Sequence, residues 1–387
     1  MKIFKKIYSY LSIGLVRAFM PINILVYIFL MKGGDGVSSF SLFIALMQVL
    51  SNIDFGVNAV LLSNKREFTF YRVINYYVLY LKKVTFWKVF LVILSVFIYS
   101  YFFNVGNGEI LHIVIFSLLC AEVVIFYNLA SNASISESNY KLIHLIISIT
   151  AICEVIVLLF FWGFNNDIHF YNMITTFVLS LFVGCICGLV YILRSEKKVT
   201  NGDYSFSFRL QMSQLSSSLI LNKDYILLYL FSMNKYAVIF AAIARVMLIP
   251  MQVNSVIISK MWVDIANSQA VRKTYLNQQK KLFFISVFLC FLPITFCLYK
   301  YGEDTYLISI LLFLFVVFNT FSGLSSAYAA VDRDAIPSAT WYLIATIFVF
   351  LMSVFVYYVN AWEASLLITS AYFYILSRKN IKGVKWS

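Results

Sequence analysis

The sequence predicts an all-α polytopic membrane protein with about twelve transmembrane helices in two six-helix lobes. First, 62% of the 387 residues are hydrophobic and only 12% are charged, whereas an ordinary soluble domain has about 25% charged residues. Second, the apolar residues form unbroken runs such as 90–99 and 308–318, which lack the alternation of a β-barrel strand. A water-soluble fold is therefore excluded.

Polar breaks divide the chain into the predicted spans. A bilayer core about 30 Å thick needs roughly 20 helical residues for each crossing, so twelve crossings use about 240 residues. The predicted spans are 9–31, 39–62, 86–104, 110–131, 142–163, 170–193, 210–231, 236–258, 282–299, 305–327, 339–358 and 362–377. The connections on the predicted outer side are all short.

The positions of lysine and arginine predict the orientation. With the N-terminus inside, 24 of the 30 basic residues lie on the inner side, three on the outer side and three within spans. Cytoplasmic loops retain these residues, so both termini are predicted to be cytoplasmic. The net charge of +13 is then mainly a signal of topology. Nucleic acid is not an expected partner, because the basic residues lie in short patches between apolar runs.

The most polar stretch of the chain, 194–209, separates six predicted spans from six. We therefore expect an N-terminal lobe over 1–193, a cytoplasmic linker over 194–209 and a C-terminal lobe over 210–387. A repeated pattern supports this division, because VNAVLLS at 57–63 is echoed by VNSVIIS at 253–259, 196 residues later. An even number of helices separates the two copies, so the lobes are predicted to be parallel repeats.

Seven charged side chains lie well inside the predicted spans, away from the span ends, where each costs a few kcal/mol unless it faces a cavity or a partner. They are the cations Arg17, Lys223 and Arg245 and the acids Asp54, Glu122, Glu154 and Asp224. They belong to spans 1, 2, 4, 5, 7 and 8. We expect those helices to line a central space, while the others face lipid.

The three cations are candidate ligands for an anionic group such as phosphate or pyrophosphate. One alternative is a structural ion pair between Arg17 and Asp54. Another is a pair between Asp224 and either Lys223 or Arg245. Because Lys223 and Asp224 are adjacent, we expect their side chains to project about 100° apart, one toward a cavity and the other toward a neighbouring helix.

Two prolines and two glutamates complete the candidate site. Pro21 and Pro250 each follow a span cation by about one turn and remove an amide donor, so each is a candidate hinge. Glu122 and Glu154 lie near the middle of their spans, where a proton-exchanging carboxyl group would suit coupling to a proton or sodium gradient. The alternative is a neutral glutamic acid that ties helices together by hydrogen bonds.

The sequence contains no enzyme signature, nucleotide-binding loop or histidine-based metal motif. Its three histidines, His112, His144 and His169, are far apart and lie near span ends, as interfacial polar residues do. We therefore expect no catalytic residue, no metal and no cofactor, with an ion gradient as the source of energy.

The stretch SNIDFGVNAVLLSNK at 51–65 resembles a pattern in Wzx-type polysaccharide flippases of the MOP superfamily. The stretch LNKDYILLYLFSMNKYAVIFAAIARVMLIPMQV at 221–253 is similar to the same flippases. There Asp224 begins the outer half of the seventh span, an Asn-Lys-Tyr turn follows, and Pro250 interrupts the eighth. The resemblance extends to the length, the span count and the six-plus-six division of the chain.

The resemblance implies a MATE-like V of two lobes whose lumen opens alternately to each side of the bilayer. It implies translocation of an undecaprenyl-pyrophosphate-linked oligosaccharide, an O-antigen or capsule repeat unit, from the cytoplasmic to the periplasmic leaflet of the bacterial inner membrane. A polysaccharide polymerase and a chain-length regulator would be potential partners. The family lumen is cationic, whereas here three span cations face four span acids. This lumen is therefore expected to be less positive.

Two other functions remain open from the sequence. A MATE-like small-molecule antiporter would share the fold, although buried lysine and arginine argue against a cationic substrate. A polytopic O-antigen polymerase or ligase would be an enzyme of the same pathway. Such enzymes resemble one another in a large periplasmic loop, which the short predicted outer connections do not provide.

Overall fold

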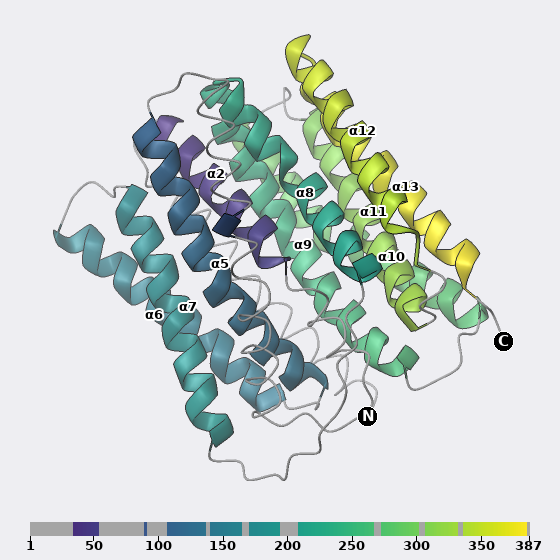
Figure 1. The fold of residues 1–387 in the computed structure, drawn as a ribbon, viewed down its shortest axis with the longest axis horizontal. Coiled ribbons are helices and arrows are strands. Elements are labelled where there is room, and N and C mark those ends of the chain that lie inside the picture. The colour runs from purple at the N-terminus through teal and green to yellow at the C-terminus, as the bar shows by residue number, and fades with distance from the viewer. Residues whose placement is uncertain are drawn as a thin grey trace. The chain divides into compact units, whose positions relative to one another are not determined.

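The computed structural model describes residues 34–53, 89–90, 107–136, 140–164, 170–193, 208–266, 272–301, 306–331 and 336–384. Over these residues the chain forms ten labelled α-helices and no strand (Figure 1). They are α2 (Gly34–Ser51), α5 (Asn107–Ser136), α6 (Tyr140–Phe164), α7 (Phe170–Leu193), α8 (Phe208–Leu230), α9 (Asn234–Ala266), α10 (Arg272–Tyr301), α11 (Tyr306–Val331), α12 (Ala339–Tyr358) and α13 (Ala364–Gly383). The all-α expectation is confirmed for this part of the chain.

The predicted spans four to twelve each lie on one helix, from α5 to α13 in order. The first span, 9–31, and nearly all of the third, 86–104, lie outside the described residues. The same holds for Arg17, Pro21 and Asp54. The total of twelve spans and the cytoplasmic position of both termini stay predictions.

Within the predicted second span, 39–62, helix α2 ends at Ser51, and residues 54–62 lie outside the described residues. The carbonyl of Gln48 accepts hydrogen bonds from the Ser51 hydroxyl (3.0 Å) and the Asn52 side-chain amide (2.7 Å). The backbone amides of Asn52 and Ile53 bond to carbonyls three residues back, at 3.2 and 3.1 Å. Side-chain donors and a tightened last turn therefore end the helix where apolar composition alone predicts that it continues.

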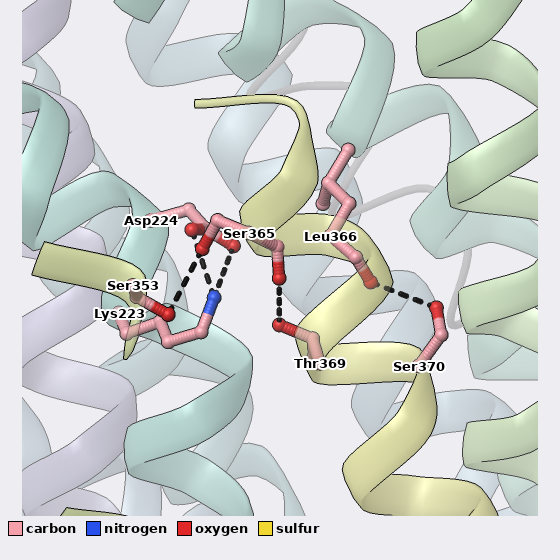
Figure 2. Close-up of polar contacts among 7 residues, drawn as sticks. All are labelled: Lys223, Asp224, Ser353, Ser365, Leu366, Thr369 and Ser370. Atoms are coloured by element: carbon pink, nitrogen blue, oxygen red, sulfur yellow. Dashed lines mark hydrogen bonds and ion pairs between the residues drawn. The ribbon is translucent and has the colours of Figure 1, made fainter. Parts of the chain in front are cut away.

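Helix α12 has an apolar exposed side and a packed side rich in hydroxyl groups. Ile344, Phe348, Leu351 and Phe355 are 58–64% exposed. The opposite stripe is buried and consists of Tyr342, Thr346, Val349, Ser353 and Tyr357. The buried hydroxyl groups include Ser353, which accepts a 3.1 Å hydrogen bond from Ser365 of α13 (Figure 2). This arrangement is the one expected where hydrocarbon replaces water as the surrounding solvent.

Three helices in the described part of the chain are long and apolar enough to cross a bilayer. Their crossing segments are Tyr236–Ile258 in α9, Tyr306–Ala329 in α11 and Ala339–Tyr358 in α12. Each has at least the roughly 20 residues that a helical crossing needs. The chain is therefore a multi-pass membrane protein.

The described helices form two compact units. One contains α2, α5, α6, α7 and α8 with the start of α9 up to Ala237, and the other begins at Val238 of α9 and contains α10 to α13. In the first unit α2 packs against α5 and α8, and α6 packs against α7; in the second, α11 packs against α10 and α13. Most of the predicted 194–209 linker lies outside the described residues, so the lobe boundaries 1–193 and 210–387 stay a prediction.

Tight turns join α8 to α9 and α12 to α13. Ser232 adopts a left-handed conformation with φ of 53°, and the amide of Met233 bonds to the carbonyl of Leu228 at 2.9 Å. Asn360, with φ of 58°, occupies the same position after α12. A left-handed residue followed by a six-to-one hydrogen bond closes a helix end within a few residues. Two of the predicted outer connections are therefore short.

Helices α6 and α7 approach closely at Gly184. A Cβ atom at this position would overlap the side chain of Thr150, whose hydroxyl donates to the carbonyl of Ile146 at 2.8 Å. Small residues allow helix backbones to approach one another in a membrane, where dispersion contacts drive association. The absence of a side chain at Gly184 is therefore required by its neighbour.

We expect Gly184→Ala to destabilise the detergent-solubilised protein by about 1–3 kcal/mol, because Thr150 must move out of its rotamer. Thermal unfolding in detergent measures this change. Gly163→Ala is the matched control, since a Cβ there meets no atom within 4 Å. Adding Thr150→Ala to Gly184→Ala should recover much of the loss. Equal losses in the two alanine variants would contradict the close approach.

Candidate functional site

Helix α8 carries a run of buried polar side chains that α9, α11 and α12 lack in this density. They are Gln211, Ser213, Ser216, Ser218, Asn222, Lys223 and Asp224. The positions of Gln211, Gln214, Ser218 and Asn222 repeat at intervals of three and four residues and so share one helix face. Helix α8 is not among the three crossing helices identified by length and apolarity in the described residues. It lies inside the first compact unit against α2.

Lys223 and Asp224 form a buried ion pair on α8. The ammonium Nζ lies 2.9 Å from Oδ1 and 3.0 Å from Oδ2 of the neighbouring carboxylate (Figure 2). Lys223 is 0% exposed and Asp224 is 3% exposed. The expectation that the two side chains point to different surroundings is therefore wrong. Although their Cβ atoms diverge, the flexible four-carbon lysine stem lets the ammonium turn back to its neighbour.

This pair keeps α8 electrically neutral at its most buried charged position. A lone charge in low dielectric costs several kcal/mol, and a well-aligned partner offsets much of that cost. The sequence alternative of a structural pair between Lys223 and Asp224 is the arrangement that the structure shows. Whether either residue contacts a substrate stays a prediction.

We expect Asp224→Ala to destabilise the protein by about 3–5 kcal/mol, because it leaves the Lys223 ammonium buried without its carboxylate. The double substitution Lys223→Met with Asp224→Leu removes both charges and should restore near-wild-type stability. Chemical unfolding in detergent compares the variants. If the double variant is as unstable as Asp224→Ala, the ion pair is not the reason for the loss.

Arg245 is the second buried cation in the described residues that the sequence assigns to the lumen. It lies within the Tyr236–Ile258 crossing segment of α9 and is 2% exposed. It belongs to the second compact unit, whereas Lys223 and Asp224 belong to the first. Helix α9 continues without interruption through Pro250, which is buried. The hinge role of Pro250 stays a prediction, as does an anion-binding role of Arg245.

The two span glutamates lie on packed helices of the first unit. Glu154 of α6 is 0% exposed, while Glu122 of α5 is partly exposed. Helices α5 and α6 pack against each other, and α5 also packs against α2 and α7. A role in ion coupling stays a prediction for both residues. No group of three metal-binding side chains occurs in the described part of the chain.

A network of uncharged polar groups joins α2 to α8. The Asn52 side-chain amide donates to Ser218 Oγ at 3.1 Å, and the Ser218 hydroxyl donates to the carbonyl of Gln48 at 3.2 Å. The Gln211 amide donates to the carbonyl of Asn52 at 3.0 Å. We name these four residues together with Gln214 the α2–α8 seam. The seam holds the end of α2 against the first half of α8.

A second network joins three helices of the other unit. The side-chain amide of Asn254 on α9 donates to Ser286 Oγ on α10 at 2.8 Å and to Thr320 Oγ1 on α11 at 3.0 Å. Both hydroxyls donate in turn to backbone carbonyls one turn back. Asn254 belongs to the echoed segment 253–259, where the sequence marked it only as part of a repeat. In the structure it joins α9, the helix that carries Arg245, to α10 and α11.

Reasoning from charges inside spans missed both networks. The signal was present on α8, where Gln211, Gln214 and Ser218 follow helical spacing within a predicted span. No such periodic signal marks Asn254, because its partners come from two other helices. Uncharged amides and hydroxyls are weaker sequence markers than charges, since a single hydroxyl can bond to its own helix.

Comparison with known proteins shows the class of fold. No protein-family model and no curated protein matches the sequence. The structure is similar to the outward-facing conformation of a multidrug resistance MATE family transporter of the MOP superfamily, with 13% identity, a TM-score of 0.61 and coverage of 97% of this chain and 95% of that chain. It is similar to the MATE transporter ClbM in complex with Rb⁺, with 11% identity, a TM-score of 0.62 and coverage of 98% and 95%.

A third similar structure is a MOP superfamily transporter from Pyrococcus furiosus, for which reverse polarity of the binding pocket suggests a different function. It shares 14% identity, with a TM-score of 0.51 and coverage of 96% of this chain and 94% of that chain. At such identities the likeness establishes the fold. The protein has the fold of the MATE transporters of the MOP superfamily, and its structural neighbours are transporters.

Proposed function

We propose that this protein is a flippase for an undecaprenyl-diphosphate-linked oligosaccharide in the bacterial inner membrane. It would move the lipid head group from the cytoplasmic to the periplasmic leaflet by alternating access. The observation that carries the proposal is the burial of Lys223 and Arg245, at 0% and 2% exposure, in helices of a MOP-type transporter fold. A cation in such a position is a functional candidate, because the bilayer interior penalises it strongly.

The chemistry of the cargo matches these side chains. A diphosphate with sugars attached cannot enter hydrocarbon without a polar path, while its lipid tail can stay in the bilayer beside the protein. Arginine offers a planar fork of donors to phosphate oxygens, and lysine offers a point charge. A small cationic solute, the typical cargo of an antiporter, would meet repulsion from the same groups.

The Lys223–Asp224 pair could exchange the Asp224 carboxylate for a phosphate group of the cargo as the partner of Lys223. In this conformation the carboxylate holds the ammonium through two contacts of 2.9 and 3.0 Å. A diphosphate carries more negative charge than one carboxylate and offers more acceptor oxygens, so it can compete for Lys223. Asp224 is thereby also a candidate acid for coupling substrate binding to an ion gradient.

The similar structures support this reading without naming the cargo. A MOP superfamily transporter from Pyrococcus furiosus has been described with a binding pocket of reverse polarity. In the present chain, buried cations favour an anionic cargo over a cationic one. A polysaccharide polymerase and a chain-length regulator are the proposed partners, because the translocated repeat unit must next be polymerised.

We expect Arg245→Gln to reduce the translocation of lipid-linked oligosaccharide by about 10–100-fold, which corresponds to one lost charged hydrogen bond. Proteoliposomes loaded with the lipid on one leaflet report translocation as access of a lectin to the sugar on the other. Lys273→Gln, at an exposed cation of α10, is the matched control and should translocate normally.

The neutral double variant Lys223→Met with Asp224→Leu should fold but translocate poorly. Thermal unfolding before each flux measurement separates loss of transport from loss of fold. If wild-type protein exchanges a small cation and leaves the lipid-linked sugar in place, the flippase proposal fails. Normal translocation by both Arg245→Gln and the double variant would remove these residues from the binding site.

A further inference from the structure

We propose that the α2–α8 seam binds the uncharged sugar residues of the cargo, at a place on α8 separate from Lys223, the residue of α8 proposed for its diphosphate. This inference rests on the proposed function and adds a carbohydrate subsite to it. The seam contains Gln48, Asn52, Gln211, Gln214 and Ser218. Its observed hydrogen bonds involve no charged side chain.

The donors at the centre of the seam are already used by the protein. The Asn52 amide donates to the Gln48 carbonyl at 2.7 Å and to Ser218 Oγ at 3.1 Å. The single Ser218 proton goes to the same carbonyl at 3.2 Å. The Gln211 amide donates to the Asn52 carbonyl at 3.0 Å. These bonds fix the orientation of the Asn52 and Gln211 amide groups. Because they occupy the central donors, the hydrogen-bonding groups that stay available in the seam are mainly acceptors.

Two acceptors of the seam have no donor from the described part of the chain. They are Oε1 of Gln211 and Oε1 of Gln214, and both atoms are buried. Gln211 is only 3% exposed, and its amide is held in the seam by the bond to Asn52. A buried acceptor without a donor costs free energy of the order of a lost hydrogen bond, and native proteins rarely retain one without a reason.

The kind of group that these acceptors can bind follows from their chemistry. Phosphate oxygens are themselves acceptors and would be repelled by carbonyl oxygens, so the seam does not suit the anionic part of the cargo. Sugar hydroxyls are donors as well as acceptors and can bond to carbonyl oxygens. A neutral, amide-rich surface with spare acceptors therefore fits carbohydrate better than diphosphate.

The position of the seam on α8 agrees with this division. Gln214 lies nine residues before Lys223, which corresponds to about 14 Å along a helix axis. In the predicted orientation Gln214 is on the cytoplasmic side of Lys223, the side from which the sugars enter. Helix α8 would thus carry a neutral sugar subsite and a charged diphosphate subsite in sequence.

Two lipids test the proposal on the full-length purified protein. One is undecaprenyl diphosphate without sugar, and the other is the lipid-linked oligosaccharide extracted from cells that produce it. We expect Gln214→Leu to weaken binding of the sugar-bearing lipid by about 2–10-fold, as loss of one neutral hydrogen bond would. Binding of undecaprenyl diphosphate should not change. Adding Gln211→Leu should deepen the loss for the sugar-bearing lipid only.

Stability distinguishes a sugar contact from a structural role. Oε1 of Gln214 accepts no hydrogen bond from the described residues, so Gln214→Leu should unfold at the wild-type temperature or above it. Gln252→Leu on α9 is the matched control and should bind both lipids normally. Equal weakening of both lipids, or a lowered unfolding temperature in Gln214→Leu, would show that the seam is structural and overturn the proposal.

The remaining outcomes separate this inference from the proposed function. If wild-type protein binds both lipids and the seam variants change neither affinity, the sugar subsite is wrong while the flippase proposal stands. If the variants lose only stabilisation by sodium ions, the acceptors hold a cation and the sugar subsite is likewise wrong. If wild-type protein binds neither lipid, both proposals fail.

Discussion

The structure depends on one constraint: a hydrocarbon solvent cannot form hydrogen bonds, so polar groups must find partners within the protein. Helices satisfy the backbone, and polar side chains turn toward one another on packed faces. The Ser353–Ser365 bond between α12 and α13 and the Asn254 network of α9, α10 and α11 follow from this constraint. Many large apolar side chains of the described helices are exposed, because contact with hydrocarbon carries no hydrophobic cost.

The same constraint acts differently on buried charges and on buried amide groups. Lys223 is tolerated inside the protein because Asp224 lies within hydrogen-bond distance, and the pair is neutral. The α2–α8 seam contains no charge in its observed hydrogen bonds, yet it retains acceptors that the described part of the chain does not satisfy. A transporter must keep some polar capacity for its cargo, so incomplete satisfaction inside a membrane protein is informative about function.

Particular residues show how far sequence reasoning reached. Apolar runs located α5 to α13, because hydrophobicity over some twenty residues is an additive local property. They did not indicate the end of α2 at Ser51, where two donors from Ser51 and Asn52 converge on the Gln48 carbonyl. The predicted spans placed Lys223 and Asp224 inside the protein, but helical spacing gave the wrong directions for their side chains. The lysine stem is flexible, so its ammonium group can lie far from the direction of its Cβ atom.

The sequence by itself determined that the protein lies in a membrane, that the described part of the chain is helical, and which positions carry charge inside it. These follow from composition and spacing, which need no knowledge of neighbours. Only the tertiary structure decided that Lys223 pairs with Asp224, that Asn254 joins three helices, and that Gln211 meets the end of α2. Each of these contacts depends on a side-chain direction or on a second helix distant in sequence, and neither is encoded in a local pattern.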